Sequence, residues 1–194
     1  MMSLPFSLKY SAGPLFIALC SVVAFFFEPM SGNYLAYDRY AIQGLETWRI
    51  VSGNIVHTNG YHLLLNLAGL ALLWALHGEH YRIGLYLKVF VWCCLGTSVG
   101  LYLFSPDLIW YAGLSGALHG IFAWGACVDI KEKMKSGWLL LIGLAIKVGY
   151  EQIDGSSEQV ANLIDAKVAV DAHLFGALTG IAIFLLMFIT AKRK

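Results

Sequence analysis

Long apolar segments recur along this chain of 194 residues, and they constrain its fold more than any other feature. A helix that crosses a bilayer needs about 20 mostly apolar residues. Six such segments are present, each bounded by Pro, Gly or charged residues: 12–28, 62–78, 83–105, 108–128, 136–152 and 169–191. Only 13% of the residues are charged, against about a quarter in soluble proteins. We therefore predict an all-α membrane protein with a bundle of six transmembrane helices.

Six spans would use about 120 residues, which leaves too little chain for a separate soluble domain. We therefore predict a single membrane domain over residues 1–194. Two connections are longer than simple turns: an outer loop at 29–61 and a polar cap loop at 153–168, which has the composition of a mobile cap. The outer loop carries aromatic residues suited to the lipid headgroup region, namely Tyr34, Tyr37, Tyr40, Trp48 and Tyr61.

The positive charges predict the orientation in the membrane. If the N-terminus is cytoplasmic, the inner side holds most of the basic residues: Lys9, Arg82, Lys88, Lys131, Lys133, Lys135, Lys192, Arg193 and Lys194. The outer side then holds only Arg39, Arg49 and Lys167. This asymmetry places both termini inside. The net charge of +1 and the lack of a basic stripe argue against a nucleic acid partner, so the lipid bilayer is the expected environment.

Polar residues inside membrane spans are costly, so their positions are informative. In the second span, His62 and Asn66 are four residues apart and share one helix face. The alternative is a histidine at the interface and an asparagine that bonds a neighbouring helix. In the fourth span, Gly113 and Gly116 flank Ser115, which would lie roughly 10 Å below the outer surface if the helix begins at Leu108.

The sixth span contains His173 together with Gly176 and Gly180. Gly116 and Gly120 give the fourth span a matching pair of small residues, so the two helices are expected to pack closely and bring His173 to Ser115. The alternative for Ser115 is a hydrogen bond to its own helix, with the glycines serving packing alone.

The second, fourth and sixth spans run in the same direction, so residues early in each lie at a similar depth. A serine nucleophile needs a neutral imidazole as its base, and His173 is the candidate. His62, the Asn66 amide and the Ser115 backbone N–H are candidate donors for the oxyanion. Asp171 faces another side of its helix, so we predict a Ser-His dyad without a third member. The metalloprotease motif HExxH is absent, and we expect neither a cofactor nor a catalytic metal.

These residues resemble the rhomboid intramembrane serine proteases over nearly the whole chain. The resemblance rests on six spans and on an ordered set of motifs: Trp48-Arg49, His57-x4-His62-x3-Asn66, Gly113-x-Ser115-Gly116 and Ala172-His173-x2-Gly176-x3-Gly180. It implies Ser115 as the nucleophile, His173 as the general base, and His62 with Asn66 as the oxyanion donors. Gly113, Gly116, His119 and Gly176 are the expected supporting residues.

Rhomboids commonly carry a tyrosine four residues after the serine, where this chain has His119. This feature in so short a protein looks like the rhombosortase branch. That branch implies substrates anchored by a C-terminal tail with a Gly-Gly motif, an apolar span and a basic cluster. It also implies a location in the cell inner membrane with the active site toward the periplasm. His119 is expected to stack on His173, to bond a water, or merely to pack.

Lys147 and Glu151 are four residues apart near the outer end of the fifth span. They either pair with each other at the interface or line a water-filled cavity at the active site. Three other functions remain open from sequence. The first is a rhomboid of general transmembrane specificity, and the second is a catalytically inactive rhomboid that acts as a chaperone. The third is a His-rich membrane protein that binds metal or haem or acts in transport, with His57, His62, His119 and His173 as the candidate residues.

Overall fold

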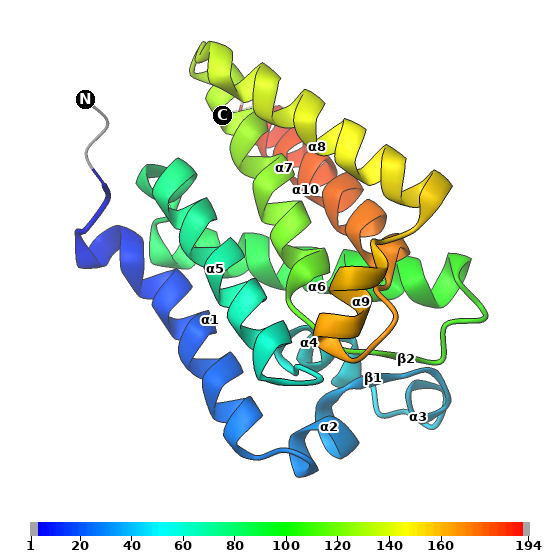
Figure 1. Ribbon diagram of the computed structural model, residues 1–194. Helices are drawn as coiled ribbons and strands as arrows, with labels where there is room; N and C mark the ends of the chain where they lie inside the picture. Colours follow the sequence, from blue (N-terminus) through cyan, green and yellow to red (C-terminus); the bar gives the residue numbers. More distant parts are fainter. Residues whose placement is uncertain (1–3, 192–194) are drawn as a thin grey trace.

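The computed structural model describes residues 4–191. Residues 192–194, which count among the predicted inner positive charges, lie outside this range. Most of the chain is helical (Figure 1). The long helices are α1 (Leu8–Phe26), α5 (Gly60–His77), α6 (Ile83–Phe104), α7 (Ser115–Lys131), α8 (Lys135–Asp154) and α10 (Val170–Ala191). The short elements are α2 (Met30–Leu35), β1 (Tyr37–Asp38), α3 (Arg39–Gln43), α4 (Arg49–Ser52), η1 (Gly53–Ile55), η2 (Gly78–His80), β2 (Trp110–Tyr111) and α9 (Glu158–Ile164).

Among the described residues, four helices are long and apolar enough to cross a membrane. They are α1, α5 extended through His80, α6, and α10 as far as Thr190. Helix α7 has 17 residues and is about 25 Å long, somewhat shorter than the hydrocarbon core. Helix α8 has the length of a span but includes Lys147 and Glu151 in its C-terminal half. Six spans therefore remain a prediction.

The predicted fourth span, 108–128, is wrong at its beginning. Residues 110–111 form β2, which pairs antiparallel with β1 and places Tyr111 opposite Tyr37. Helix α7 begins only at Ser115. The expectation of an all-α chain is therefore also wrong for these two short strands. Gly113 has a φ of +128°, a conformation that L side chains rarely adopt, so the chain cannot continue as a helix through it.

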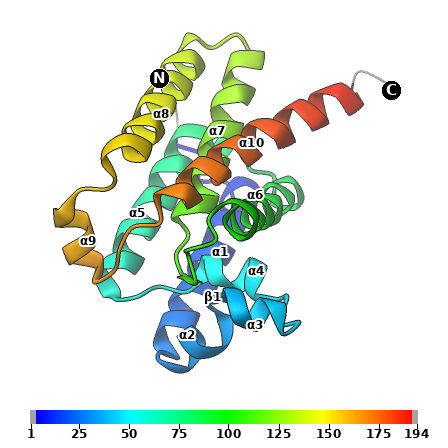
Figure 2. The ribbon, with the colours of Figure 1, turned by 90° about the vertical axis from the view of Figure 1, so that its right-hand side faces the viewer.

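Helix α7 lies in the middle of the bundle between α5, α6, α8 and α10 (Figures 1 and 2). Its contact with α10 depends on the four predicted glycines. A Cβ atom on Gly176 or Gly180 would collide with the backbone carbonyl of Gly116 or Gly120, respectively. The close packing expected from the sequence is confirmed. Helices α5, α7 and α10 all begin at the end of the bundle where α4 and α9 lie, and they run in the same direction (Figure 1).

Two buried arginines hold the outer loop in place. Arg39 is 8% exposed, and its guanidinium group donates to four backbone carbonyls in and after the last turn of α6: those of Leu101, Tyr102, Ser105 and Leu108. These bonds satisfy carbonyls that a helix end leaves unpaired. Arg49 donates in the same way to the carbonyls of Asn33 and Ala36 at the end of α2.

The aromatic residues of the outer loop divide into two groups. Tyr34, Tyr40, Trp48 and Tyr61 are exposed, in agreement with a place in the headgroup region. Tyr37 is fully buried, and its predicted interfacial place is wrong. The pairing of β1 with β2 brings Tyr37 into an apolar cluster with Leu101, Tyr111 and Ala172.

The cap loop contains α9, whose first turn is capped by the Ser157 hydroxyl. Ile164, the last residue of α9, is 5% exposed. The Thr58 hydroxyl donates to the Ile164 carbonyl over 2.5 Å, and the Asn59 amide donates to the Leu163 carbonyl over 3.0 Å. The cap is thereby joined to the segment that precedes α5. Its mobility remains a prediction.

Candidate active site

Ser115 is the first residue of α7 and follows an irregular segment, residues 112–114. The segment is held at Gly113, whose N–H donates to the Gly53 carbonyl and whose carbonyl accepts from the Tyr111 hydroxyl. The first N–H groups of a helix have no partner within the helix, and the helix dipole is positive there. The structure thus places Ser115 at a helix N-terminus, whereas the sequence predicted a position two turns into a helix.

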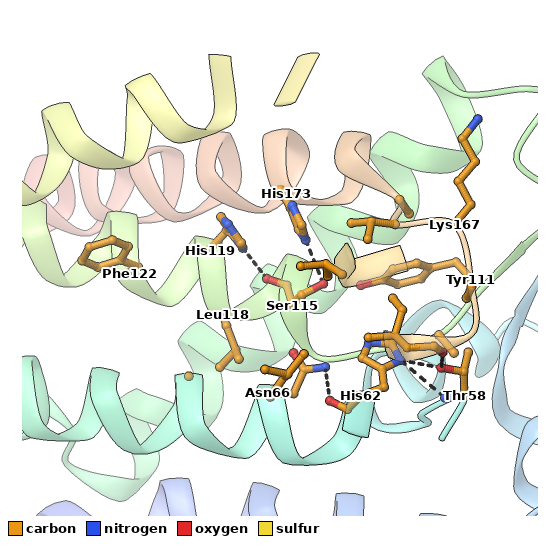
Figure 3. Close-up of a pocket in the computed structure, with 18 of the residues that line it drawn as sticks. Thr58, His62, Asn66, Tyr111, Ser115, Leu118, His119, Phe122, Lys167 and His173 are labelled. Carbon is orange, nitrogen blue, oxygen red and sulfur yellow. Dashed lines mark hydrogen bonds between the residues drawn. The ribbon is translucent and has the colours of Figure 1, made fainter. Parts of the chain in front are cut away.

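The Ser115 hydroxyl and the His173 imidazole are in direct contact. Ser115 Oγ lies 3.0 Å from His173 Nε2 (Figure 3). His173 is in the first turns of α10 and is 5% exposed, and Ser115 is half-buried. Because the glycines let α10 approach α7 so closely, two residues 58 positions apart in the chain meet at hydrogen-bond distance.

His62 and Asn66 lie on the neighbouring helix α5 and point toward the segment before Ser115 (Figure 3). A Cβ atom built on Gly113 would be 2.7 Å from His62 Nε2 and 3.8 Å from Asn66 Nδ2. The two side-chain nitrogens therefore converge on the backbone two residues before the serine. Asn66 Nδ2 also donates to the His62 carbonyl over 3.1 Å, which holds the amide in place.

His119 lies one turn below Ser115 on α7. Its ring stacks on that of His173, with centroids 4.1 Å apart and planes inclined by 13°. His119 Nδ1 is 2.7 Å from the Ser115 carbonyl oxygen, which can only accept a hydrogen bond. Of the roles expected for His119, stacking on His173 is the one that the geometry shows.

Lys147 and Glu151 of α8 both reach His173, so the expectation that no carboxylate lies beside this histidine is wrong. Glu151 Oε2 lies 2.8 Å from His173 Nδ1 and 2.8 Å from Lys147 Nζ. Asp171 indeed faces elsewhere and accepts from the Ser105 hydroxyl at 2.6 Å. A carboxylate does reach the histidine, but it comes from a different helix. The sequence alone could not show that α8 packs beside α10 at this level.

His119, Glu151 and His173 each offer one potential ligand atom, and these atoms lie within 4.8 Å of one another. The Lys147 ammonium group lies against all three, at 2.6 Å from His119 Nε2, 2.8 Å from Glu151 Oε2 and 3.2 Å from His173 Nδ1. The Lys147 ammonium group therefore already contacts all three groups that could hold a metal ion. The other two histidines of the predicted metal or haem set, His57 and His62, contact each other instead, with ring centroids 5.1 Å apart.

The site opens into a cavity of about 650 Å³ between α5, α7 and the cap. Its polar end holds Ser115, His173 and His62, and its walls continue along apolar side chains of α5 and α7. The apolar lining includes Leu65, Leu72, Leu76, Leu118 and Phe122. One sequence interpretation expected both Lys147 and Glu151 to line the cavity, but of the two only Lys147 does. The two residues form the ion pair that the other interpretation expected. A cavity of this shape suits an apolar polypeptide segment beside the reactive groups.

Two residues at the site were not predicted from the sequence. The Thr58 backbone N–H donates to His62 Nδ1 over 3.4 Å, and Thr58 Oγ1 lies 2.9 Å from the same nitrogen, so Thr58 orients the imidazole as well as holding the cap. Tyr111 fixes the Gly113 carbonyl at 2.6 Å. Thr58 lies directly after His57, within the motif His57-x4-His62-x3-Asn66, and this position was the only indication in the sequence that Thr58 belongs to the site.

The chain is similar to one known protein family over most of its length. A model of the rhomboid domain matches residues 44–190, which cover most of the chain and all the residues of the site. No curated protein matches the chain. The protein therefore belongs to the rhomboid family of intramembrane serine proteases.

Proposed function

We propose that the protein is an endopeptidase in which Ser115 is the nucleophile and His173 the general base. The observation that carries this proposal is the 3.0 Å contact between Ser115 Oγ and His173 Nε2 at the polar end of the cavity. A serine hydroxyl is a weak nucleophile until a neighbouring base accepts its proton. Burial of the imidazole beside the hydroxyl and its stacking on His119 support this role.

In the first step, Ser115 Oγ bonds to the scissile carbonyl carbon while its proton passes to His173 Nε2. The tetrahedral intermediate then breaks its C–N bond, and the leaving amine takes the proton from His173. This leaves an acyl-enzyme on Ser115. A water molecule gives a proton to His173 and attacks the acyl carbon. The second intermediate then breaks its bond between this carbon and Ser115 Oγ, which takes the proton back from His173, and the carboxyl product leaves.

The oxyanion of each intermediate needs donors fixed in advance. We assign this role to His62, Asn66 and the Ser115 backbone N–H. The convergence of His62 Nε2 and Asn66 Nδ2 on Gly113 supports the assignment, as does the position of Ser115 at the N-terminus of α7. Gly113 leaves room for the His62 imidazole, and Gly116 lets α7 pack closely against Thr97 and the Ala172 carbonyl, because neither glycine adds a side chain there.

We propose that α7 and α8 complete a single domain of six membrane spans, with both termini in the cytoplasm. The central position of α7 supports this, because a helix surrounded by other helices need not be uniformly apolar. The active site would then face the periplasmic side of the inner membrane. The exposed aromatic residues beside the site end of the bundle support that placement.

The substrates that we propose are proteins anchored by a C-terminal tail of the rhombosortase type. A helical substrate hides its amides in hydrogen bonds, whereas a Gly-Gly pair destabilises the helix and exposes the scissile bond. The apolar walls of the cavity and the replacement of the usual tyrosine by His119 support this class. The alternative is a rhomboid of general transmembrane specificity.

The nucleophile is tested by labelling the protein in membranes with a fluorophosphonate probe. Wild type and Ser136→Ala, which alters an exposed serine at the start of α8, are expected to label equally. Ser115→Ala and His173→Ala are expected to lose labelling. Equal labelling of wild type and Ser115→Ala would refute the mechanism, and a histidine-dependent metal content that Ser115→Ala leaves intact would favour the metal-binding alternative.

The substrate class is tested with a reporter that carries a Gly-Gly tail, an apolar span and a basic cluster, co-expressed with the protein. The matched reporter replaces Gly-Gly with Leu-Leu and keeps the rest of the tail. Cleavage of the first reporter at least 10-fold faster than the second supports the rhombosortase class. Equal cleavage of both reporters would favour general transmembrane specificity.

A further inference from the structure

We propose that Glu151 is a positioning residue for His173, so that the site works as a Ser115–His173–Glu151 triad in which Lys147 holds the carboxylate. The proposal rests on the proposed function. Its geometric basis is a continuous series of contacts through the imidazole ring. Ser115 Oγ is 3.0 Å from Nε2 on one side of the ring, and Glu151 Oε2 is 2.8 Å from Nδ1 on the other.

The hydrogen-bond partners assign one consistent set of protons. His173 must accept at Nε2 to serve as a base, so its Nδ1–H donates to the Glu151 carboxylate. His119 Nδ1 faces the Ser115 carbonyl and must carry a proton, which leaves His119 Nε2 as an acceptor. The Lys147 ammonium group supplies the matching donor at 2.6 Å. Its 3.2 Å approach to His173 Nδ1 joins two donors and is not a hydrogen bond in this assignment.

Glu151 is suited to hold the imidazole. Its side chain is 12% exposed and accepts from two donors at the same oxygen, Oε2. When His173 takes the serine proton, the imidazolium ion faces a carboxylate 2.8 Å away, so the new charge is compensated without reorganisation. Without Glu151, the imidazole would be free to adopt the other tautomer, which places the proton on Nε2 and cannot accept from Ser115.

Lys147 has a structural reason to accompany Glu151. The two residues are four apart on α8 and form an ion pair on one helix face. The ammonium group donates to the Glu151 carboxylate on one side and to His119 Nε2 on the other. Lys147 therefore holds His119 directly, and it holds His173 through Glu151. Glu151 itself is not among the described residues that line the cavity, whereas Lys147 is. A substrate in the cavity would therefore meet Lys147 and not the carboxylate.

The test is the steady-state cleavage of the Gly-Gly reporter by purified full-length variants in proteoliposomes. We expect Glu151→Gln to lower kcat by about 10⁴-fold, as the same carboxylate-to-amide change of the third member does in other serine hydrolases. KM should change less than 3-fold, because Glu151 does not line the cavity. The control Asp154→Asn removes an exposed carboxylate one turn further along α8 and should keep wild-type kcat.

A second variant distinguishes a positioning role from general loss of structure. Glu151→Ala should be similarly inactive, and added formate should raise its kcat at least 10-fold by supplying a carboxylate next to His173. Formate should not affect Asp154→Asn or Ser115→Ala. Lys147→Met keeps Glu151 and should lower kcat about 10-fold. Wild-type kcat in Glu151→Gln, or loss of activity in Glu151→Ala that formate does not reverse, would overturn the proposal.

The two proposals fail in different ways. If Ser115→Ala still reacts with the fluorophosphonate probe, the proposed function fails. If Ser115→Ala loses labelling while Glu151→Gln keeps the wild-type labelling rate, the nucleophile stands and only the triad fails.

Discussion

Gly120 of α7 and Gly176 of α10 set the separation of these helices, and the separation sets the distance between Ser115 and His173. A Cβ atom on Gly120 would lie 2.6 Å from Cys93 Sγ and 2.7 Å from the Gly176 carbonyl oxygen, where ordinary contact begins at 3.4 Å. Helix α10 must then move outward by about 0.7 Å, since a backbone carbonyl cannot rotate away. The 3.0 Å contact between Ser115 Oγ and His173 Nε2 would lengthen to about 3.7 Å, which is beyond hydrogen-bond range.

We therefore expect Gly120→Ala to lower the rate of fluorophosphonate labelling by about 10-fold or more, since a misplacement of 1 Å costs about 100-fold in rate. Gly176→Ala should lose about 100-fold, because its Cβ would collide more severely with the Gly116 carbonyl. Overpacking should also lower the free energy of unfolding by about 1–3 kcal/mol. The assays are the initial rate of fluorophosphonate labelling and thermal unfolding of the purified protein.

The matched control is Gly143→Ala on α8, where a Cβ atom would meet none of the described residues within 4 Å. It should keep wild-type activity and gain about 0.5–1 kcal/mol of stability from the helical alanine. Wild-type labelling rates in Gly120→Ala and Gly176→Ala would refute the reasoning, because the contact of the two backbones would then not control the site.

Three further predictions concern the surroundings of the site. Arg39→Lys should lower the free energy of unfolding by about 2–4 kcal/mol, because one ammonium group cannot satisfy the four carbonyls that accept from the guanidinium group. Thermal unfolding measures this change, and unchanged stability would contradict the prediction. Thr58→Val removes the hydroxyl between Ile164 and His62 but keeps the backbone N–H that donates to His62 Nδ1. We expect kcat for the reporter to fall about 10-fold, whereas an unchanged kcat would show that the hydroxyl is not needed to hold His62. Burial, with a smaller effect of His62, lowers the pKa of His57 to about 3 from an unfolded value near 6.5. The folded state therefore favours the neutral ring, so the contribution of His57 to the free energy of unfolding is complete above pH 6.5 and decreases as the pH falls toward 3. His57→Gln should flatten the decrease in the free energy of unfolding between pH 7 and 4. An equal slope in wild type and variant would refute this prediction.

Local patterns in the sequence were sufficient for much of the fold. The apolar segments predicted the bounds of α1, α5, α6, α8 and α10 to within a few residues at most ends, since hydropathy and helix length are properties of contiguous residues. The small residues at Gly116, Gly120, Gly176 and Gly180 gave the contact of α7 with α10. The start of α7 was missed, because the pairing of Tyr111 with Tyr37 depends on a strand more than 70 residues earlier.

The sequence by itself determined that the polar residues of the spans would gather at one depth, because α5, α7 and α10 run in the same direction and carry them early. It identified Ser115, His173, His62 and Asn66 as one group. Only the tertiary structure decided which side chain contacts His173 on the side of the ring opposite Ser115. Glu151 reaches it from α8, and Thr58 reaches His62 from the segment before α5. Such contacts depend on the angles and separations between helices, which packing of the whole bundle sets and no local sequence pattern records.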